Sequence, residues 1–374
     1  MNKKIVHITS AHPRNDIRIF TKMCLSLARA SYDVTLIVAD GKGDEVNNGV
    51  KISDVGKVDG RFARMFYSAK NVYLKALSLN ADIYHLHDPE LLPYALKLKN
   101  KGKTVVFDSH EDVPVQILSK PYFNKFLLKL ISVIFECFEN FVCKKLDCIV
   151  GATPFITNKF LKINSNSLNI NNYPILGELE SDSEILSTEK SIKNTICYVG
   201  GISVIRGAYE LAEAIRYVKN NVKLCFAGSI SEDLSRKILH NTDSANKINL
   251  VGVLSRSEVK ELLNTSFAGL VTLLPTLAYK DSLPIKMFEY MSAGLPVIAS
   301  NFPLWKEIIE GNDCGICVDP LSPKEIAETI DWLYENQDKA KEMGKNGQKA
   351  VYEKYNWQNE EKKLLGLYKI ITGL

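Results

Sequence analysis

Two acidic residues eight positions apart frame a segment that could bind a phosphorylated sugar. Asp281 is followed by Ser-Leu-Pro-Ile-Lys-Met-Phe and then by Glu289, and Gly294 comes five residues later. We expect a loop, a short helix capped by Ser282 with Pro284 in its first turn, and a stop at Gly294. The amino end of such a helix attracts a pyrophosphate, and nearby carboxylates accept hydrogen bonds from sugar hydroxyls. The segment therefore points to a nucleotide-sugar enzyme.

A glycine-rich turn supplies a second anion-binding pattern. It reads Gly200-Gly201-Ile-Ser-Val-Ile-Arg206-Gly207 and directly follows a predicted strand. Glycines let the backbone come close to a phosphate, and Arg206 carries a permanent charge on a forked set of donors. Taken alone, the pattern also fits an ordinary loop with a surface arginine. It gains weight because the segment from Asp281 to Glu289 falls in the same predicted domain.

The elements that must position these residues follow a repeating order. Short β-branched runs alternate with helical patterns, such as Ile17–Arg29 and Leu91–Lys99, in both halves of the chain. The predicted strands are Ile5–Thr9, Tyr32–Val38, Ile83–His87, Thr104–Asp108, Cys148–Ala152, Thr195–Val199, Lys223–Ala227, Ile248–Val251, Gly269–Leu273 and Val297–Ala299. This alternation predicts an α/β fold with two Rossmann-like, doubly wound domains, in which ligands bind at the carboxyl ends of the strands.

Composition limits the classes of function. The 374 residues are 46% hydrophobic and 24% charged, as in ordinary globular proteins, and the net charge of +4 argues weakly against nucleic acid as a partner. The amino-terminal residues are typical of a strand and not of a signal peptide. Apolar surroundings at Cys148, Cys197 and Cys225 predict buried, reduced thiols and a cytoplasmic protein. For Cys314 and Cys317 we expect packing and no metal, because no second pair lies nearby.

The motifs of the second half occur in one order. They are Gly200-Gly201 with Arg206-Gly207, Phe226-Ala-Gly228, Val251-Gly252-Val253, and Asp281-x7-Glu289-Tyr-Met-Ser-Ala-Gly-Leu-Pro-Val. This order resembles the retaining glycosyltransferases of family 4, which have the GT-B fold. Two segments of the first half, His12-Pro-Arg-Asn-Asp16-Ile-Arg18 and Asp108-Ser-His110-Glu111-Asp112, are similar to bacterial surface-polysaccharide members.

The resemblance implies a domain plan. Residues 1–172 would form the acceptor-binding domain, 173–190 a linker, and 191–355 the nucleotide-sugar domain. The two Rossmann-like domains would face each other across a cleft. The last helix, 356–374, would pack back on the first domain.

The resemblance also implies roles for individual residues. The catalytic set is His110, which would reach the donor sugar, Asp281, which would contact it near the reacting centre, and Glu289, which would hold the ribose. The acceptor contacts would be Asp16 and Arg18. The donor-binding set is Gly201, Arg206, Val253, Leu254, Ser282, Leu283, Ile285, Lys286 and Glu289.

Two departures from the family pattern affect this site. Asp281 stands where the family carries Glu, so its carboxylate reaches one methylene less. Gly201 stands where many relatives carry Arg, which leaves Arg206 as the clearest basic contact for the diphosphate. We hypothesise that Lys286, in the first turn of the phosphate helix, supplies the missing charge.

A purely structural role is an alternative for several of these residues. His110 could be a core histidine at a strand end. His85 and His87 alternate along a strand and so share a face; metal binding, loop shaping, acceptor contact and simple packing all fit. Asp16 and Arg18 could form only a local salt bridge at a helix start.

The segment 120–145 is apolar and aromatic, and it carries lysines along its length. Its charges at Lys125, Lys129, Glu136 and Glu139 argue against a membrane span. An interfacial helix would suit a lipid-linked acceptor at the inner membrane face. The alternative is a helix half buried against the sheet, and we expect a mixture of the two.

The function expected from these observations is transfer of a hexose with retained configuration. The donor would be a UDP-sugar, with GDP-sugars as the second choice, and the acceptor a bacterial capsule, exopolysaccharide or O-antigen glycan, including lipid-linked forms. No Asp-x-Asp triplet is present, so we expect no metal and no cofactor. Two rivals remain, namely a nucleotide-sugar epimerase of the same fold and a non-catalytic scaffold of a glycan assembly complex.

Overall fold

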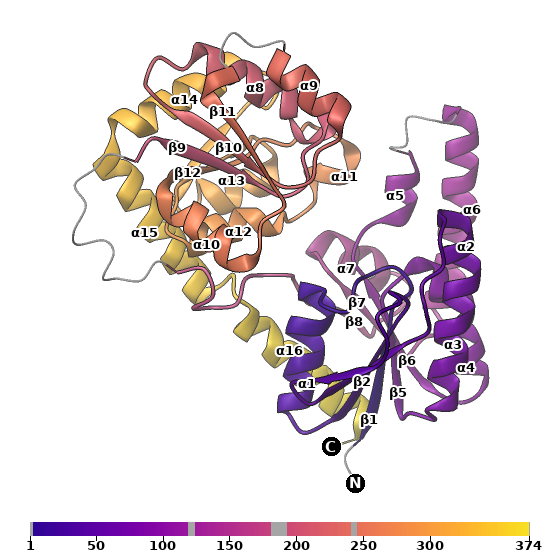
Figure 1. Cartoon of the computed structure of the whole chain (residues 1–374). Helices are drawn as coiled ribbons and strands as arrows, with labels where there is room; N and C mark the ends of the chain where they lie inside the picture. The colour runs from indigo at the N-terminus through magenta and orange to yellow at the C-terminus, as the bar shows by residue number, and fades with distance from the viewer. Residues whose placement is uncertain (1–2, 119–123, 181–192, 241–244, 374) are drawn as a thin grey trace. The chain divides into compact units, whose positions relative to one another are not determined.

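The chain folds into two compact units. The computed structural model describes residues 3–118, 124–180, 193–240 and 245–373. Unit 1 comprises Met1–Asn172 and Trp357–Leu374, and unit 2 comprises Tyr173–Asn356 (Figure 1). The linker expected at 173–190 begins inside unit 2, because Tyr173 and Leu179 are buried in that unit's core. Residues 181–190 lie outside the described residues.

Unit 1 is built on an eight-stranded sheet with the order β3-β4-β2-β1-β5-β6-β7-β8. All neighbouring strands are parallel except β3, which runs antiparallel to β4. The central strands are almost wholly buried, which explains their continuous β-branched sequences. The strands are β1 (Lys4–Ile8), β2 (Asp33–Val38), β3 (Glu45–Asn47), β4 (Val50–Asp54), β5 (Ile83–Leu86), β6 (Thr104–Ser109), β7 (Cys148–Gly151) and β8 (Ser167–Asn169).

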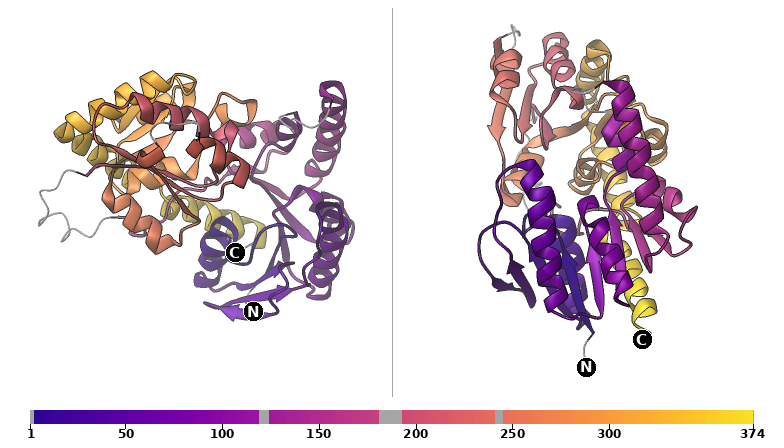
Figure 2. Two further views of the ribbon diagram at one scale, coloured as in Figure 1. Left: turned by 45° about the horizontal axis from the view of Figure 1, so that its top comes forward. Right: turned by 90° about the vertical axis from the view of Figure 1, so that its right-hand side faces the viewer.

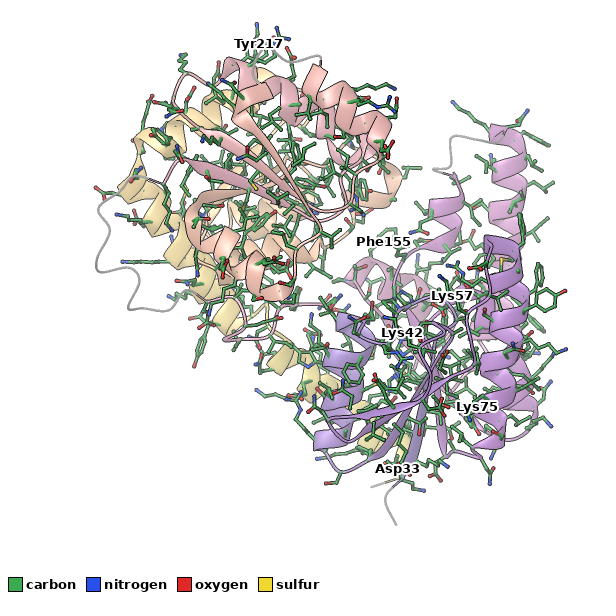
Figure 3. The ribbon with its side chains drawn as sticks, viewed as in Figure 1. Asp33, Lys42, Lys57, Lys75, Phe155 and Tyr217 are labelled. Carbon is green, nitrogen blue, oxygen red and sulfur yellow. The ribbon has the colours of Figure 1, made fainter. Side chains whose placement is uncertain are left out.

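Helices cover both faces of this sheet. In Figure 1, α3, α4 and α6 lie on one face, and α1 and α16 lie on the other. Figure 3 marks the two ends of the strands, with Asp33 at the amino end of β2 and Lys42 and Lys57 in loops at the carboxyl ends. The helices are η1 (a π-helix, Ile17–Cys24), α1 (Leu25–Arg29), α2 (Arg61–Ala63), η2 (Arg64–Ser68), α3 (Ala69–Ser78), η3 (Pro89–Leu91), α4 (Leu92–Asn100), α5 (Val113–Leu118), α6 (Lys125–Cys143), α7 (Pro154–Leu161) and α16 (Trp357–Thr372).

The last helix, α16, is an integral part of unit 1, and both views of Figure 2 show it against that unit. Trp357 is buried and donates its indole N–H to Ser26 Oγ at 3.1 Å. The buried carboxylate of Glu360 accepts the backbone N–H of Asn171 at 2.9 Å. Tyr368 is fully buried beneath the sheet's histidines. These contacts place the end of the chain in the core of the first half.

Unit 2 is built on a six-stranded, wholly parallel sheet with the order β11-β10-β9-β12-β13-β14. The strands are β9 (Thr195–Val199), β10 (Lys223–Ala227), β11 (Ile248–Gly252), β12 (Ser266–Val271), β13 (Val297–Ser300) and β14 (Gly315–Val318). The helices are η5 (Val204–Arg206), α8 (Ala208–Tyr217), α9 (Glu232–His240), η6 (Ala245–Lys247), α10 (Arg256–Thr265), α11 (Leu277–Lys280), α12 (Ile285–Ser292), α13 (Pro303–Ile309), α14 (Pro323–Glu335) and α15 (Gln337–Glu353).

Strand alternation divides unit 2 into two hydrophobic cores. In β9, Ile196 and Tyr198 face the core formed with α8, α9 and α14, whereas Cys197 faces the core formed with α10, α12 and α13. Cys148, Cys197 and Cys225 are buried free thiols, as predicted. Cys314 is also buried, and its Sγ lies 3.4 Å from the carbonyl oxygen of Ile309.

The sequence patterns missed the short or polar strands. β3 and β4 form a hairpin at the sheet edge, where half-exposed strands carry weak hydrophobic patterns. β8 lies in the asparagine-rich stretch, and its backbone pairs with β7 although its side chains are polar. Backbone pairing requires no apolar side chain, so composition concealed these strands.

Candidate functional site

The turn after β9 forms the floor of the candidate donor site in unit 2. Gly200 has φ +117°, a conformation that other residues rarely adopt. A Cβ atom at Gly228, in the loop after β10, would collide with the carbonyl oxygen of Gly200. Two backbone loops therefore touch at the carboxyl edge of the sheet, where a ligand can approach them closely.

Arg206 folds over this turn. Its Nη1 donates a hydrogen bond to the carbonyl oxygen of Gly201 at 3.0 Å, and its Nε lies 3.4 Å from the hydroxyl of Tyr279. A Cβ atom at position 201 would lie 2.8 Å from Nη1. The missing side chain at position 201 thus leaves room for the Arg206 guanidinium over the turn.

Lys286 brings a second basic side chain to the same turn. It lies in the first turn of α12, and its Nζ is 3.4 Å from the centre of the Tyr198 ring. Nζ is buried and has no hydrogen-bond partner among the described residues. A Cβ atom at Gly200 would lie 3.4 Å from it. Burial, and then the charge of Arg206, lower the pKa of Lys286 well below its ordinary value.

The loop before α12 differs from the prediction in its capping. The helix begins at Ile285 and its N-cap is Pro284, because Pro284 has extended backbone angles. Ser282 is therefore not the N-cap; its hydroxyl donates to the carbonyl oxygen of Tyr279 at 2.9 Å. The carbonyl of Ser282 accepts the indole N–H of Trp305 at 2.8 Å, which anchors the loop to α13.

The remaining loop residues lie at or near the surface. Leu283 and Ile285 are half-buried, and Asp281 is exposed. The Asp281 carboxylate makes no hydrogen bond or ion pair within the part of the chain that the structure describes. Val253 is 76% exposed and Leu254 half-buried in the loop between β11 and α10.

Glu289 is buried in an ion-pair cluster that sequence reasoning missed. Arg256 donates from Nη1 to Glu289 Oε1 at 2.7 Å. The same guanidinium binds Glu178 with two hydrogen bonds, at 2.8 and 2.9 Å. The position of Arg256, two residues after the predicted base contact Leu254, was the one signal for its role. Arg256 thus fixes the predicted ribose ligand.

The centre of the polar cluster in unit 1 is Asp108, at the end of β6. Arg18 donates to both of its oxygens, from Nε at 2.9 Å and Nη2 at 2.7 Å. His110 Nε2 and His87 Nδ1 lie 2.9 and 3.2 Å from Oδ2. Burial raises the pKa of the Asp108 carboxyl, but the Arg18 charge and the histidine contacts outweigh it and hold the pKa well below its usual range. Asp108 is therefore a buried anion at neutral pH.

This anion sets the tautomers of a chain of histidines. A carboxylate only accepts, so His87 Nδ1 must donate to Asp108, and neutral His87 then accepts from His7 Nδ1 at 2.8 Å. His7 Nε2 in turn accepts from the Tyr368 hydroxyl at 3.4 Å, and that oxygen accepts from His85 Nδ1 at 2.7 Å. Burial lowers the pKa of His7, His85 and His87, so all three are neutral at pH 7.

The same histidines are candidate metal ligands by proximity, and their geometry argues against that role. His85 and His87 stack with an interplanar angle of 14°, and His7 and His87 with one of 18°. A metal must lie in the plane of each ring that binds it, and nearly parallel stacked rings share no such point. His87, Asp108 and His110 also converge, but Arg18 already neutralises that carboxylate. Both groups fit a hydrogen-bonded network better than a metal site.

Asp88 organises the loop after β1. Its Oδ2 accepts hydrogen bonds from Thr9 Oγ1 at 2.9 Å and from the backbone N–H groups of Ser10 and Ala11. Its Oδ1 pairs with His12 Nδ1 at 2.8 Å. Burial raises the pKa of Asp88, but these hydrogen bonds outweigh it and lower the pKa to about 2. Burial lowers the pKa of His12, yet Asp88 outweighs it and the pKa is raised.

The two predicted acceptor contacts have structural partners. Asp16 caps η1 by accepting the backbone N–H groups of Arg18 and Ile19, both at 2.9 Å. Arg18 is only 3% exposed and donates to Asp108 and to the carbonyl oxygen of Ile170. Arg18 forms its ion pair with Asp108, and not the local salt bridge with Asp16 that the sequence also allowed. Both side chains have structural partners, and their contact with an acceptor stays a prediction.

Comparison with known families identifies the chain. The sequence model described as "Glycosyltransferase Family 4" matches residues 18–167, and that of "Glycosyl transferases group 1" matches residues 183–350. The chain belongs to the family 4 glycosyltransferases. Members of this family are transferases. The first match lies in unit 1 and the second in unit 2.

Similar proteins agree with this assignment. An uncharacterised glycosyltransferase from Methanocaldococcus jannaschii is 29% identical over 178 residues, which cover 47% of this chain and 44% of the relative. The chain thus spans less than half the length of that relative. Sucrose-phosphate synthase from Thermosynechococcus elongatus aligns over 100% of both chains with a TM-score of 0.81 and 15% identity. HepE from Anabaena, solved with UDP and glucose, aligns over 100% of both chains with a TM-score of 0.74 and 14% identity. The fold is GT-B.

The described residues contain no helix that combines the length and the apolar character needed to cross a membrane.

Proposed function

We propose that this glycosyltransferase moves a hexose, with retained configuration, from a UDP-sugar onto a growing bacterial surface glycan. The observation that carries the proposal is the convergence of Arg206 and Lys286 on the Gly200–Gly201 turn. Two basic side chains over a backbone turn at the carboxyl edge of a parallel sheet suit a diphosphate. HepE, which has the same fold, was solved with UDP, and this supports a UDP-sugar as the first donor to test.

The remaining donor contacts follow from the geometry around that turn. Val253 and Leu254 are proposed to contact the base. Glu289 is proposed to hold the ribose: Arg256 takes its Oε1, and its Oε2 accepts no hydrogen bond from the residues that the structure describes. The backbones of Ser282, Leu283 and Ile285 are proposed to lie beside the diphosphate. The hydrogen bond from α13 to the carbonyl of Ser282 holds this loop in position.

The proposed chemistry needs no protein nucleophile. The bond between the anomeric carbon and the leaving diphosphate oxygen breaks, and a bond to the acceptor oxygen forms on the same face. The acceptor proton passes to the departing diphosphate. The protein contributes orientation and charge stabilisation, and neither a metal nor a cofactor is part of the proposal. Asp281 and His110 are proposed to contact the sugar, with Asp108 fixing the His110 ring.

Unit 1 also carries a surface that suits a membrane-bound acceptor. Helix α6 exposes a row of apolar side chains on one side, and Lys125 and Lys129 are exposed beside them. The opposite side is buried against the unit through Leu128, Val142 and Cys143. The exposed row consists of Phe126, Leu127, Leu130, Ile131, Val133, Ile134 and Phe141. An apolar surface with lysines fits an anionic lipid interface, so we propose a lipid-linked acceptor at the inner membrane face.

A thermal-shift panel tests the donor. At a concentration of 100 times Kd, a bound donor stabilises the protein by about 2.7 kcal/mol, or about 5–10 °C for a unit of this size. The panel contains UDP-glucose, UDP-N-acetylglucosamine and GDP-mannose. Glu289→Gln is expected to weaken binding about 10- to 100-fold, because a charged acceptor is lost. Glu328→Gln, on the exposed face of α14, serves as the matched control.

The outcomes separate the proposal from its rivals. No stabilisation by any of the three compounds would contradict a nucleotide-sugar site. Binding followed by consumption of donor without an acceptor would favour an epimerase. Binding without turnover, together with a normal surface glycan in an Asp281→Ala or Glu289→Ala strain, would favour a scaffold.

Vesicle flotation tests the membrane contact separately. Vesicles with anionic phospholipid are expected to carry the protein upward, and Phe126→Ser with Ile134→Ser is expected to abolish this. Val46→Ser removes an equally exposed apolar side chain from β3 and should leave flotation unchanged. Equal loss in both variants, or no flotation of the native protein, would contradict the contact.

A further inference from the structure

The amine of Lys286 is buried without a hydrogen-bond partner among the described residues, which is unusual for a lysine. The stem of the side chain is partly exposed, whereas Nζ itself is buried over the Tyr198 ring at 3.4 Å. A charged ammonium normally retains water or an acceptor at each of its three donors. An aromatic face compensates for only part of that loss. A bound group that carries hydrogen-bond acceptors would satisfy this amine.

The groups around Nζ determine which form it takes in the free protein. Arg206, from η5, contributes a fixed positive charge, and Glu289, three positions along α12, contributes a negative one. From β9, the Tyr198 ring lies under Nζ and Cys197 lies close enough to interact with it. Burial raises the pKa of the Cys197 thiol to about 12 and the pKa of the Tyr198 hydroxyl above its usual range, so both are neutral. The Glu289 carboxylate is already paired with Arg256 at 2.7 Å. Burial and Arg206 therefore favour the neutral amine.

A diphosphate at the Gly200–Gly201 turn would reverse this balance. A Cβ atom at Gly200 would lie 3.4 Å from Nζ, at van der Waals contact, so a ligand atom in the space where Gly200 has no side chain would touch the amine. Phosphate oxygens in that space would supply both hydrogen-bond acceptors and negative charge, and each favours the ammonium form. Arg206 cannot respond in this way because a guanidinium stays protonated at all relevant pH values. The turn thus pairs one permanent charge with one that can titrate.

We propose that Lys286 takes up a proton when the diphosphate of the donor binds at the Gly200–Gly201 turn. The proposal rests on the donor site proposed above and adds a pH dependence to it. Below the pKa of the free protein, Lys286 is already charged and the affinity is independent of pH. Above it, binding must bring in a proton, so Kd rises up to tenfold per pH unit until the pKa of the complex is reached.

Titration calorimetry with UDP-glucose tests the proton uptake directly. UDP-glucose has no terminal phosphate that titrates near neutral pH, so its own protons do not enter the balance. Binding heats are compared at pH 7.5 in HEPES and in Tris, whose ionisation enthalpies differ, and the difference gives the protons taken up. We expect uptake of up to one proton, and a Kd that rises with pH over the range in which uptake is measured.

Three variants assign the proton to its residue. Lys286→Met is expected to bind more weakly and without uptake. Lys286→Arg keeps the charge but cannot titrate, so it is expected to bind with no uptake and no change of Kd with pH. Lys280→Met removes an exposed lysine at the end of α11, in the same loop, and should leave the uptake unchanged.

The outcomes separate this inference from the donor site on which it rests. Binding of UDP-glucose without proton uptake would overturn the role of Lys286 and leave the donor site intact. Uptake that persists in Lys286→Arg would assign the proton to another group and also overturn it. If neither UDP-glucose, UDP-N-acetylglucosamine nor GDP-mannose binds, the donor site and the inference both fail.

Discussion

The replacement Arg18→Met gives the sharpest test of the buried network in unit 1. It removes three hydrogen bonds, two to Asp108 at 2.9 and 2.7 Å and one to the Ile170 carbonyl at 2.9 Å. The Asp108 side chain is 0% exposed, so its charge would remain buried with histidine partners alone. Breaking a buried pair on one side costs about 3–5 kcal/mol. We expect unit 1 to lose that much free energy of unfolding at pH 7.

The chain contains a matched control in Arg14. This arginine binds Asp40 with the same forked geometry, at 2.8 and 2.7 Å, but the two side chains are 10% and 14% exposed. Water can therefore solvate Asp40 after Arg14→Met, and we expect a loss of about 1–2 kcal/mol. The difference between the two variants measures what burial adds to a bidentate pair.

Hydrogen exchange measures the loss within unit 1 alone. Amides of β5 and β6 should exchange faster in Arg18→Met by about two to nearly four orders of magnitude, if they open with the unit. The cost should also shrink in acid. The folded protein holds the pKa of Asp108 below the unfolded value of about 3.9, so the Asp108 carboxylate adds stability above that value and the stability is lost as pH falls through the folded pKa. Arg18→Met raises the folded pKa of Asp108. In the variant the Asp108 carboxyl is therefore protonated at a higher pH than in the native protein, and the buried charge that makes the variant unstable disappears in acid. An equal effect of Arg14→Met, or a cost independent of pH, would refute the reasoning.

Two further predictions concern unit 1, one at the Tyr368 end of this network and one at the neighbouring Asp88 cluster. Tyr368→Phe leaves His85 Nδ1 and His7 Nε2 without their hydroxyl partner, and it should lower the stability of unit 1 by about 1–3 kcal/mol. His12→Ala should cost more at pH 5.5 than at pH 9. The pKa of His12 is raised by Asp88, so its stabilisation is complete below the unfolded value of about 6.5 and is lost as pH rises through the folded value.

Each of these two predictions has its own check. Denaturant unfolding of Tyr368→Phe is compared with Tyr67→Phe, since the Tyr67 side chain is 64% exposed and its loss should be neutral. Equal stability of the two variants would show that the hydroxyl of Tyr368 satisfies nothing. For His12→Ala, unfolding midpoints at the two pH values are compared with the native protein. A difference that stays constant, or grows toward pH 9, would contradict pairing with Asp88.

Much of the fold followed from local patterns. The strands β9 and β10 and the helical span from Ile17 to Arg29 were predicted at their observed bounds. A strand or helix is determined by the periodicity of its own side chains, which any reader of the sequence can measure. Capping was less certain. Ser282 has the composition of an N-cap, but the loop turns on its bond to Tyr279, and the helix starts three residues later.

The sequence by itself determined where the candidate site residues lie along the chain, since glycines, charges and acids at fixed spacing are local features. Only the tertiary structure decided their partners. Arg18 meets Asp108 across 90 positions and His85 meets Tyr368 across 283. Arg256 joins Glu178 to Glu289 for the same reason. Such pairs depend on which strands become neighbours and in what register, as when β1 sets His7 opposite His85. No spacing in the sequence encodes that choice.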